Sequence, residues 1–150
     1  EEANHADGNW RHVAITWDGS YVRGYIGGVY KKRVAQSGSM NNNDWGDMYL
    51  GYRAGSEHLT GNMDEFRISN IARYTTETSF TPQTTDFTDD ANTIILWHLN
   101  DGTGTNANDG SSNNLDGTLA GGTSWSTDVP YAGITSSVND IIGGFIPFAR

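Results

Sequence analysis

The chain has 150 residues and a formal net charge of −9, and its five Trp, seven Tyr and five Phe supply large side chains for the core of one domain. Because nine Lys and Arg stand against eighteen Asp and Glu, we expect no nucleic-acid partner. Zero Cys excludes disulfides and thiolate metal sites, and no apolar run approaches the ~20 residues of a membrane span, so no transmembrane segment is predicted.

Three strands are predicted near the start of the chain, at residues 10–17, 21–26 and 29–34. Their β-branched and aromatic side chains favour extended backbone, and the Asp-Gly and Gly-Gly pairs between them are turn signals, which predicts an antiparallel meander. Val13 and Ile15 share one face of the first strand, while Ala14 and Thr16 share the other. Because both faces are fairly apolar, we place this strand centrally in a sheet. The basic run at residues 31–33 predicts a solvated strand edge.

Further strands are predicted at residues 48–53, 61–69, 94–99, 115–119 and 123–126. Alternation along 61–69 puts Asp64 on the same face as Phe66 and Ile68, so that an acid lies on the apolar face. Its neighbour Glu65 points to the opposite face.

The segment at residues 73–93 has no periodicity and predicts an irregular connection whose acidic residues are solvated. His12 and His98 fall within predicted strands, where a hydrogen-bonded core imidazole is favoured over a metal ligand. The loop at residues 101–114 consists almost wholly of Gly, Asn, Asp, Ser and Thr. No segment predicts a helix of four turns.

Three ordered motifs resemble a known family. They read WRHVAITWDG at residues 10–19, VRGYIGG at residues 22–28 and GNMDEFRISNIA at residues 61–72. This half of the chain resembles the closing half of laminin G-like domains in the concanavalin A-like lectin/glucanase superfamily. The resemblance implies an all-β fold, a jelly-roll sandwich of two antiparallel sheets, in a protein that is secreted or lies on a cell surface or virion.

A second group of motifs resembles the opening strand and loop of the same family, namely LWHLNDGTG at residues 96–104, DGSSNN at residues 109–114 and DGTL at residues 116–119. The closing half therefore precedes the opening half, either at the junction of two tandem domains or in a permuted fold. We predict a laminin G-like closing half, a connecting segment with opening-type strands, and an apolar tail that docks or is donated as a strand. Their bounds are residues 1–85, 86–128 and 129–150.

Glucanases of this superfamily place their catalytic carboxylates at alternate positions of a strand, about 5.5 Å apart. Here the carboxylate pair on a predicted strand, Asp64 and Glu65, is adjacent and so points to opposite faces. No Ser lies in a nucleophile-elbow context, and no two His share a strand face. We predict that the chain is not an enzyme.

Calcium is the cofactor that the sequence favours, because its oxygen ligands are abundant in the loop after residue 100. The candidate ligands are Asp64, Asn100, Asp101 and Asp109. The resemblance implies that Asp64, the acid of the Gly-x-x-Asp-Glu motif, lies close to the opening strand and its loop. A buried Asp64 must be hydrogen-bonded or metal-bound, and both alternatives stay open.

A ligand site is predicted around the polar loop that contains Trp45. An exposed aromatic ring beside amide and acid groups stacks on the C–H face of a sugar, and the candidate residues are Trp45, Asn43, Asp47 and Tyr52. His58 is expected near them. The alternative is that Trp45 folds back over the sheet edge and anchors the loop.

The apolar tail is predicted to take part in assembly through Ile141, Ile142, Phe145, Ile146 and Phe148, because exposure to solvent would make it adhesive. We predict a non-catalytic extracellular module for adhesion or recognition of a glycan or a cell-surface protein. The alternative is a structural subunit of an extracellular filament, cell coat or virion appendage. In that case strands of a neighbouring subunit, or of the rest of a larger parent chain, would complete the sheets.

Overall fold

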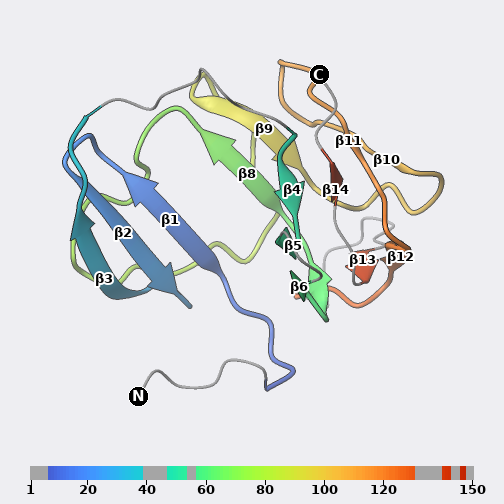
Figure 1. Cartoon of the computed structure of the whole chain (residues 1–150), viewed down its shortest axis with the longest axis horizontal. Coiled ribbons are helices and arrows are strands. Elements are labelled where there is room, and N and C mark those ends of the chain that lie inside the picture. The colour runs from blue at the N-terminus through green and yellow to red at the C-terminus, as the bar shows by residue number, and fades with distance from the viewer. Residues whose placement is uncertain (1–6, 39–46, 54–56, 131–139, 143–145, 148–150) are drawn as a thin grey trace. The chain divides into compact units, whose positions relative to one another are not determined.

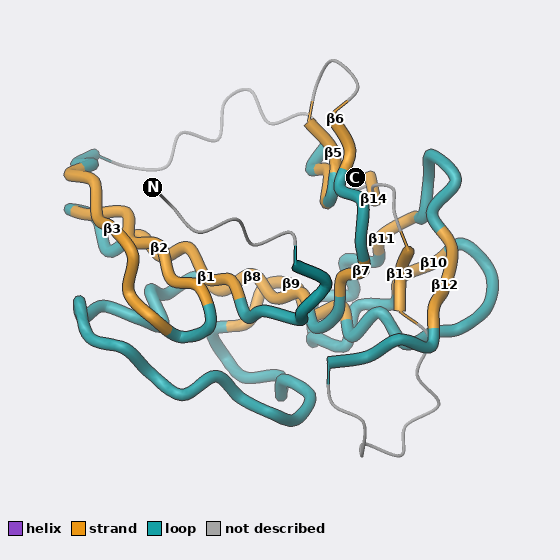
Figure 2. The backbone as a smooth tube through the Cα atoms, turned by 90° about the horizontal axis from the view of Figure 1, so that it is seen from below, coloured by secondary structure: helices purple, strands orange, loops and turns teal. Residues whose placement is uncertain are grey.

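The computed structural model describes residues 7–38, 47–53, 57–130, 140–142 and 146–147. These residues form fourteen strands and no helix, and their strand pairs are all antiparallel (Figures 1 and 2). The predicted all-β antiparallel class is therefore confirmed. A search of the described part of the chain for a helix able to cross a membrane found none.

The chain forms two compact units, each made of two separate stretches. Unit 1 contains residues 1–40 and 71–83, and unit 2 contains residues 41–70 and 84–150. The strands of unit 1 are β1 (Val13–Trp17), β2 (Tyr21–Ile26) and β3 (Val29–Ala35). Those of unit 2 are β4 (Tyr49–Leu50), β5 (Tyr52–Arg53), β6 (Glu57–His58), β7 (Asn62–Met63), β8 (Phe66–Ser69), β9 (Thr93–Trp97), β10 (Asn106–Ala107), β11 (Gly117–Thr118), β12 (Ser124–Ser126), β13 (Asp140–Ile142) and β14 (Ile146–Pro147). The three predicted domain bounds stay a prediction.

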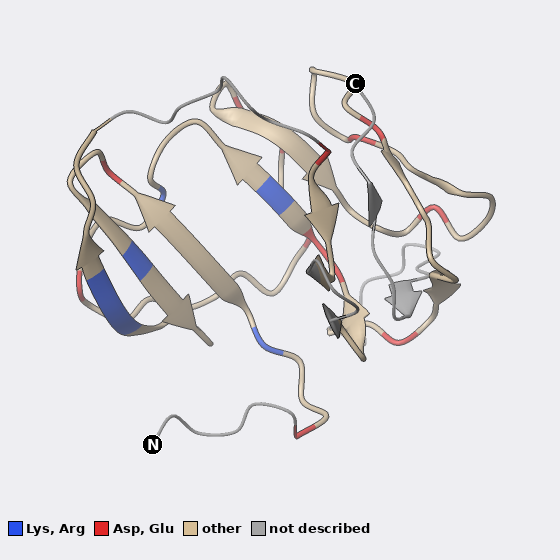
Figure 3. Cartoon of the chain, in the orientation of Figure 1, with Lys and Arg blue, Asp and Glu red and all other residues tan. Residues whose placement is uncertain are grey.

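The predicted meander is present in unit 1 as a three-stranded sheet in the order β1-β2-β3 (Figure 1). The predicted central position of the first strand is wrong, because β1 lies at an edge and β2 in the middle. Val13 and Ile15 on β1 are 66% and 77% exposed, so unit 1 leaves this apolar face of the strand uncovered. The basic residues 31–33 lie exposed on the other edge strand, β3, as predicted (Figure 3).

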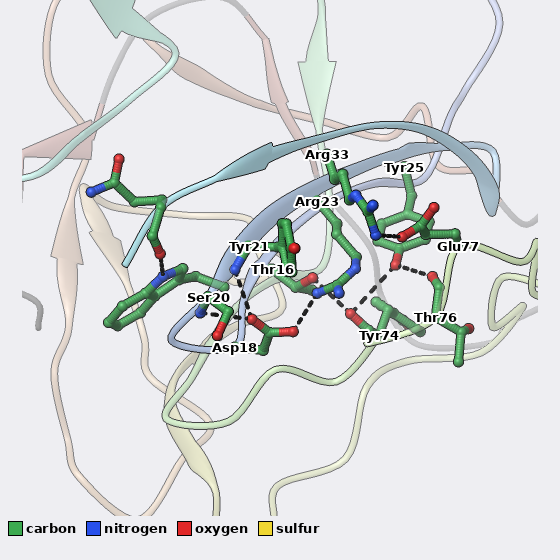
Figure 4. Close-up of polar contacts among 12 residues, drawn as sticks. Thr16, Asp18, Ser20, Tyr21, Arg23, Tyr25, Arg33, Tyr74, Thr76 and Glu77 are labelled. Carbon is green, nitrogen blue, oxygen red and sulfur yellow. Dashed lines mark hydrogen bonds and ion pairs between the residues drawn. The ribbon is translucent and has the colours of Figure 1, made fainter. Parts of the chain in front are cut away.

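Residues 71–83 cover the opposite face of this sheet through polar anchors (Figure 4). The hydroxyl of Thr16 donates to the carbonyl of Tyr74 at 2.7 Å, and the hydroxyl of Tyr25 donates to the carbonyl of Thr76 at 2.5 Å. Both donors come from the buried face of the sheet, where Tyr25 is 1% exposed. These bonds satisfy polar groups that burial would otherwise leave unpaired.

The turn between β1 and β2 is fixed by Asp18 (Figure 4). Its carboxylate accepts hydrogen bonds from the backbone N–H groups of Ser20 and Tyr21, and it pairs with buried Arg23 at 2.5 Å. The hydrogen bond from Arg23, together with those backbone bonds, lowers the pKa of Asp18 to about 2. The Asp-Gly turn signal of the sequence thus has a specific physical basis.

In unit 2 the central strand pair is β8 with β9, in a register that places Phe66 opposite Trp97. Around it lies a buried cluster of Ile95, Trp97, Leu99, Ala107 and Leu119. Trp97 is fully buried, and its indole N–H donates to the carbonyl of Leu115 at 2.9 Å. The predicted strand at residues 94–99 is present as β9, a core strand of this unit, but β9 ends at Trp97, and Leu99 beyond it has a φ of 61°.

The predicted unbroken strand at residues 61–69 is wrong. β7 ends at Met63, β8 begins at Phe66, and Glu65 between them has a φ of 53°. Because this left-handed residue interrupts the alternation, Met63 packs against the same buried cluster as Phe66 and Ile68. Asp64 is half-buried in the interruption rather than a regular member of an apolar strand face.

Candidate functional site

One group of side chains in the described part of the chain could hold a metal ion. It consists of Glu65, Asp86 and His98, whose candidate ligand atoms lie within 4.8 Å of one another. All three residues are half-buried and come from separate segments: the interruption between β7 and β8, the connection that precedes β9, and the residue after β9. We call this the EDH group.

Glu65 is the centre of the EDH group because both of its carboxylate oxygens are engaged. Oε1 lies 2.8 Å from Nδ1 of His98, and Oε2 accepts the backbone N–H of Phe87 at 2.7 Å. The side chain of Glu65 is 12% exposed. The hydrogen bond from Phe87 also ties the segment that carries Asp86 to Glu65, so the three residues are held together by the backbone.

His98 is charged more readily here than in water. The hydrogen bond with Glu65 raises the pKa of His98 above its ordinary value, although burial acts in the opposite direction. The negative charges of Glu65, Asp86 and Asp64 add to the rise. The surroundings of His98 therefore favour a positive charge on or beside the imidazole.

Gly110 sets the position of the His98 ring from the other side. A Cβ at Gly110 would lie 3.0 Å from Nε2 of His98, closer than almost any ordinary Cβ contact. The N–H of Gly110 donates to the carbonyl of Leu96 at 2.7 Å, which holds the glycine against β9. The imidazole thus lies between Glu65 and a backbone that approaches it closely.

The residues predicted to bind calcium do not form such a group in the described part of the chain. Asp64 adjoins Glu65 and acts on His98 through its charge. Asp101 accepts hydrogen bonds from the backbone and side chain of Asn108, and half-buried Asn100 precedes it. The calcium assignment stays a prediction.

Asp109 is fully committed to the protein. Its Oδ1 accepts the N–H groups of Leu96 and Ser111 at 2.8 and 2.9 Å. Its Oδ2 accepts the N–H of Leu115 at 2.8 Å and the hydroxyl of Ser111 at 2.7 Å. Burial alone would raise the pKa of Asp109, but these hydrogen bonds outweigh it and hold the pKa below its usual value. Four donors fill the lone pairs that a calcium ligand would need, so Asp109 does not fit a calcium ion in this conformation.

The structure describes two of the four predicted ligand residues, Asp47 and Tyr52. Trp45 and Asn43 lie outside the described residues. Tyr52 lies on β5 with its ring 5.3 Å from that of His58 and 5.5 Å from that of Tyr49. The Tyr49 hydroxyl is 3.4 Å from Oδ2 of exposed Asp47. We call Tyr49, Tyr52 and His58 the tyrosine patch.

The predicted assembly residues also divide. Phe145 and Phe148 lie outside the described residues, whereas Ile141 and Ile142 belong to β13 and Ile146 to β14. β13 pairs with β12 on one side and β7 on the other, and β14 pairs with β4. The tail therefore supplies strands to its own chain, and a role in assembly stays a prediction.

The laminin G family model described as concanavalin A-like lectin/glucanases superfamily matches residues 1–79, just over half of the chain. The chain belongs to this family. The match confirms the resemblance of the motifs at residues 10–72, while the motifs at residues 96–119 lie outside it. No curated protein and no solved structure gives a significant match to this laminin G-like chain.

Laminin G-like domains are typically extracellular and mostly non-catalytic, although the superfamily includes glucanases. Family membership thus supports the predicted fold class and the general setting of the chain. It does not name a ligand.

Sequence reasoning missed the EDH group. It treated Asp86 as a solvated acid, favoured a core role for His98 and placed Glu65 opposite the apolar face. Glu65 lies 21 residues before Asp86 and 33 residues before His98, and the three residues form no short motif. The pairing of β8 with β9 brings Glu65 to His98. The Asp-Glu pair of the family motif was the available signal in the sequence, and the metal prediction named Asp64 rather than Glu65.

Proposed function

We propose that this chain is a non-catalytic extracellular recognition module, secreted or displayed on a cell surface or virion, that binds a glycan or a cell-surface protein at the tyrosine patch. The observation that carries the proposal is the patch itself. Tyr49 is 42% exposed, and its ring, the Tyr52 ring and the His58 ring adjoin one another beside the carboxylate of Asp47.

The chemistry of the patch suits a sugar. Aromatic faces stack on the C–H faces of a pyranose ring, and a neighbouring carboxylate accepts hydrogen bonds from its hydroxyls. Burial of the Tyr49 hydroxyl and the charge of Asp47 raise the pKa of Tyr49, so the phenol stays neutral and able to donate a hydrogen bond. The predicted Trp45 and Asn43 would add a further ring and amide from the preceding loop.

The arrangement of the motif carboxylates supports a non-catalytic role. Glucanases of this superfamily place their catalytic carboxylates at alternate positions of a strand. Asp64 and Glu65 are instead adjacent and lie in the interruption between β7 and β8.

The first test is a glycan array, followed by calorimetry with any glycan that binds. Tyr49→Ala and Tyr52→Ala should each weaken binding by at least about 10-fold, which corresponds to the loss of one stacking contact of about 1.4 kcal/mol. Ile71→Ala, which removes an exposed apolar side chain outside the patch, is the matched control and should leave affinity unchanged. Binding that survives both tyrosine substitutions would contradict the proposal.

A structural subunit is the second candidate, and the exposed face of the unit 1 sheet favours it. Val13, Ile15, Val29 and Val34 are 66%, 77%, 46% and 54% exposed, and β1 is an edge strand of the sheet. In the described part of the chain β1 pairs with β2 alone, and an apolar sheet face beside such an edge strand is a surface on which a further strand or a second copy can pack. Electron microscopy of native material that shows filaments or arrays would favour this candidate over the recognition module.

Calcium, the predicted cofactor, is tested apart from either function. If Asp64 contributes to a calcium site, Asp64→Asn should lower the melting temperature in calcium and leave it unchanged in chelator. Equal losses in both conditions would assign Asp64 to hydrogen bonding alone.

A further inference from the structure

We propose that Glu65, Asp86 and His98 form a binding site for a divalent transition-metal ion of the zinc class. This site is independent of the proposed function, since none of its residues belongs to the tyrosine patch. It also differs from the predicted calcium site in all of its ligands.

The geometry of the EDH group is close to what such an ion requires. Zinc bonds to imidazole nitrogen and carboxylate oxygen are about 2.0–2.2 Å long, so its ligand atoms lie roughly 3–4 Å from one another. The three candidate atoms lie within 4.8 Å of one another, and Nδ1 of His98 is 2.8 Å from Oε1 of Glu65. The ion would replace the Nδ1 proton of His98, which is released to solvent, together with the hydrogen bond between His98 and Glu65. Side-chain rotation alone would then bring the three ligand atoms around the ion.

The protein already holds these ligands in place. The N–H of Phe87 fixes the second oxygen of Glu65, as an outer hydrogen bond commonly does for a metal-binding carboxylate. The close approach of Gly110 limits the rotation of the His98 ring. The register of β8 and β9 then sets the distance between the two segments that carry these side chains.

The donor set decides the class of ion. Calcium and magnesium prefer sites made wholly of oxygen, and calcium takes six to eight ligands. An imidazole nitrogen with two carboxylates instead suits zinc and its neighbours, with water in the remaining positions. The ion would join the connection before β9 to the β8–β9 pair at three points, and so stabilise the folded chain.

The direct test uses the whole wild-type chain with histidine side chains labelled with ¹⁵N. After treatment with chelator, Zn²⁺ is added in steps while calorimetry measures affinity and NMR follows the four imidazoles. We expect one ion per chain and a large shift of the Nδ1 resonance of His98, with the other imidazoles unchanged. A shift confined to another histidine, or no saturable binding, would overturn the proposal.

Variants then assign the ligands. Glu65→Gln, Asp86→Asn and His98→Gln should each weaken Zn²⁺ binding by more than about 10-fold. Asp89→Asn is the matched control, because Asp89 is an exposed acid of the same connecting segment and should keep wild-type affinity. Circular dichroism of each variant identifies any that fails to fold, and the wild-type NMR result decides the proposal even if one does.

Calcium provides the final comparison. The same titration with Ca²⁺ should leave the His98 resonance unchanged and should not compete with Zn²⁺. If Ca²⁺ displaces Zn²⁺ at equal concentration, or if His98→Gln keeps full Zn²⁺ affinity, the site is not of the zinc class.

Discussion

At the scale of single residues, the carboxylate of Asp109 organises a loop of unit 2 by hydrogen bonding. It accepts four hydrogen bonds from three residues, and its own N–H donates to Asp116 at 2.9 Å. The Asp-Gly-Ser-Ser-Asn-Asn run at residues 109–114 owes its shape to this carboxylate. The sequence predicted Asp109 as a candidate calcium ligand. A loop rich in Gly, Asn, Asp and Ser is typical both of an aspartate that binds calcium and of one that accepts backbone N–H groups, so composition does not separate the two roles.

Asp109→Asn should destabilise the protein by about 3 kcal/mol at neutral pH. An amide offers one acceptor oxygen where the carboxylate offers two, so donors of the loop lose their partners. Urea unfolding monitored by tryptophan fluorescence measures the change. The exposed Asp89→Asn substitution should shift the free energy of unfolding by less than about 0.5 kcal/mol.

The pH dependence of stability provides a separate test of Asp109. Its pKa is lowered in the folded chain, so the carboxylate stabilises the fold above the unfolded value of about 3.9. That contribution is lost as the pH falls through the folded pKa. The difference in unfolding free energy between wild type and Asp109→Asn should therefore shrink below about pH 4. Asp18, whose pKa is about 2, is present in the wild type and in the variant, so its titration cancels in this difference. A difference that stays constant with pH would contradict this account.

At the scale of secondary-structure elements, the turn between β2 and β3 docks onto the covering segment of unit 1. The N–H of Phe80 donates to the carbonyl of Gly28 at 2.8 Å, and the rings of Phe80 and Tyr74 stack with centroids 3.8 Å apart. A Cβ at Gly28 would lie 2.1 Å from the carbonyl oxygen of Phe80. Adjacent Gly27 also has a positive φ, but its Cβ would meet nothing within 4 Å.

Gly28→Ala should therefore destabilise the chain by at least about 2 kcal/mol more than Gly27→Ala. Both substitutions place alanine in the left-handed region at a cost of about 1–2 kcal/mol, and only the first also displaces residues 80–82. Thermal unfolding of the two variants measures the difference. Equal melting temperatures would show that the covering segment does not contact this turn.

Element existence was more predictable than element position. The meander of β1, β2 and β3 follows directly from turn residues and apolar alternation. The edge position of β1 does not, because a strand with two apolar faces is typical both of a sheet centre and of a surface that another layer covers. The interruption at Glu65 could not be predicted from the sequence either, because nothing in the residue type of Glu65 indicates the φ of 53° that breaks the alternation.

At the scale of the whole molecule, the acidic charge and the exposed sheet face act in opposite directions. A net charge of −9 keeps copies apart at low salt, whereas Val13 and Ile15 favour contact between apolar surfaces. Self-association measured by sedimentation should therefore increase from low salt to about 0.5 M NaCl, where screening shortens the range of repulsion to a few ångströms.

Ile15→Lys should reduce this association at every salt concentration, because it places a charge in the middle of the exposed face. Ile71→Lys, at a residue that is 48% exposed outside the sheet, is the control and should have a smaller effect. A wild-type chain that stays a compact monomer throughout would leave the recognition module as the better candidate and would contradict assembly through this face.

The sequence by itself determined the all-β class, the first meander and the family, because turn signals, alternation and ordered motifs are local properties of the chain. It also predicted that Tyr52 and His58 lie near Trp45, and the structure places the two rings 5.3 Å apart, while Trp45 lies outside the described residues. Only the tertiary structure decided which acid of the Asp64–Glu65 pair contacts His98. It also decided that the Asp109 carboxylate accepts hydrogen bonds from the protein rather than being open to a metal ion. Those choices depend on strand register and on one left-handed residue, and neither has a signature in the local pattern of residues.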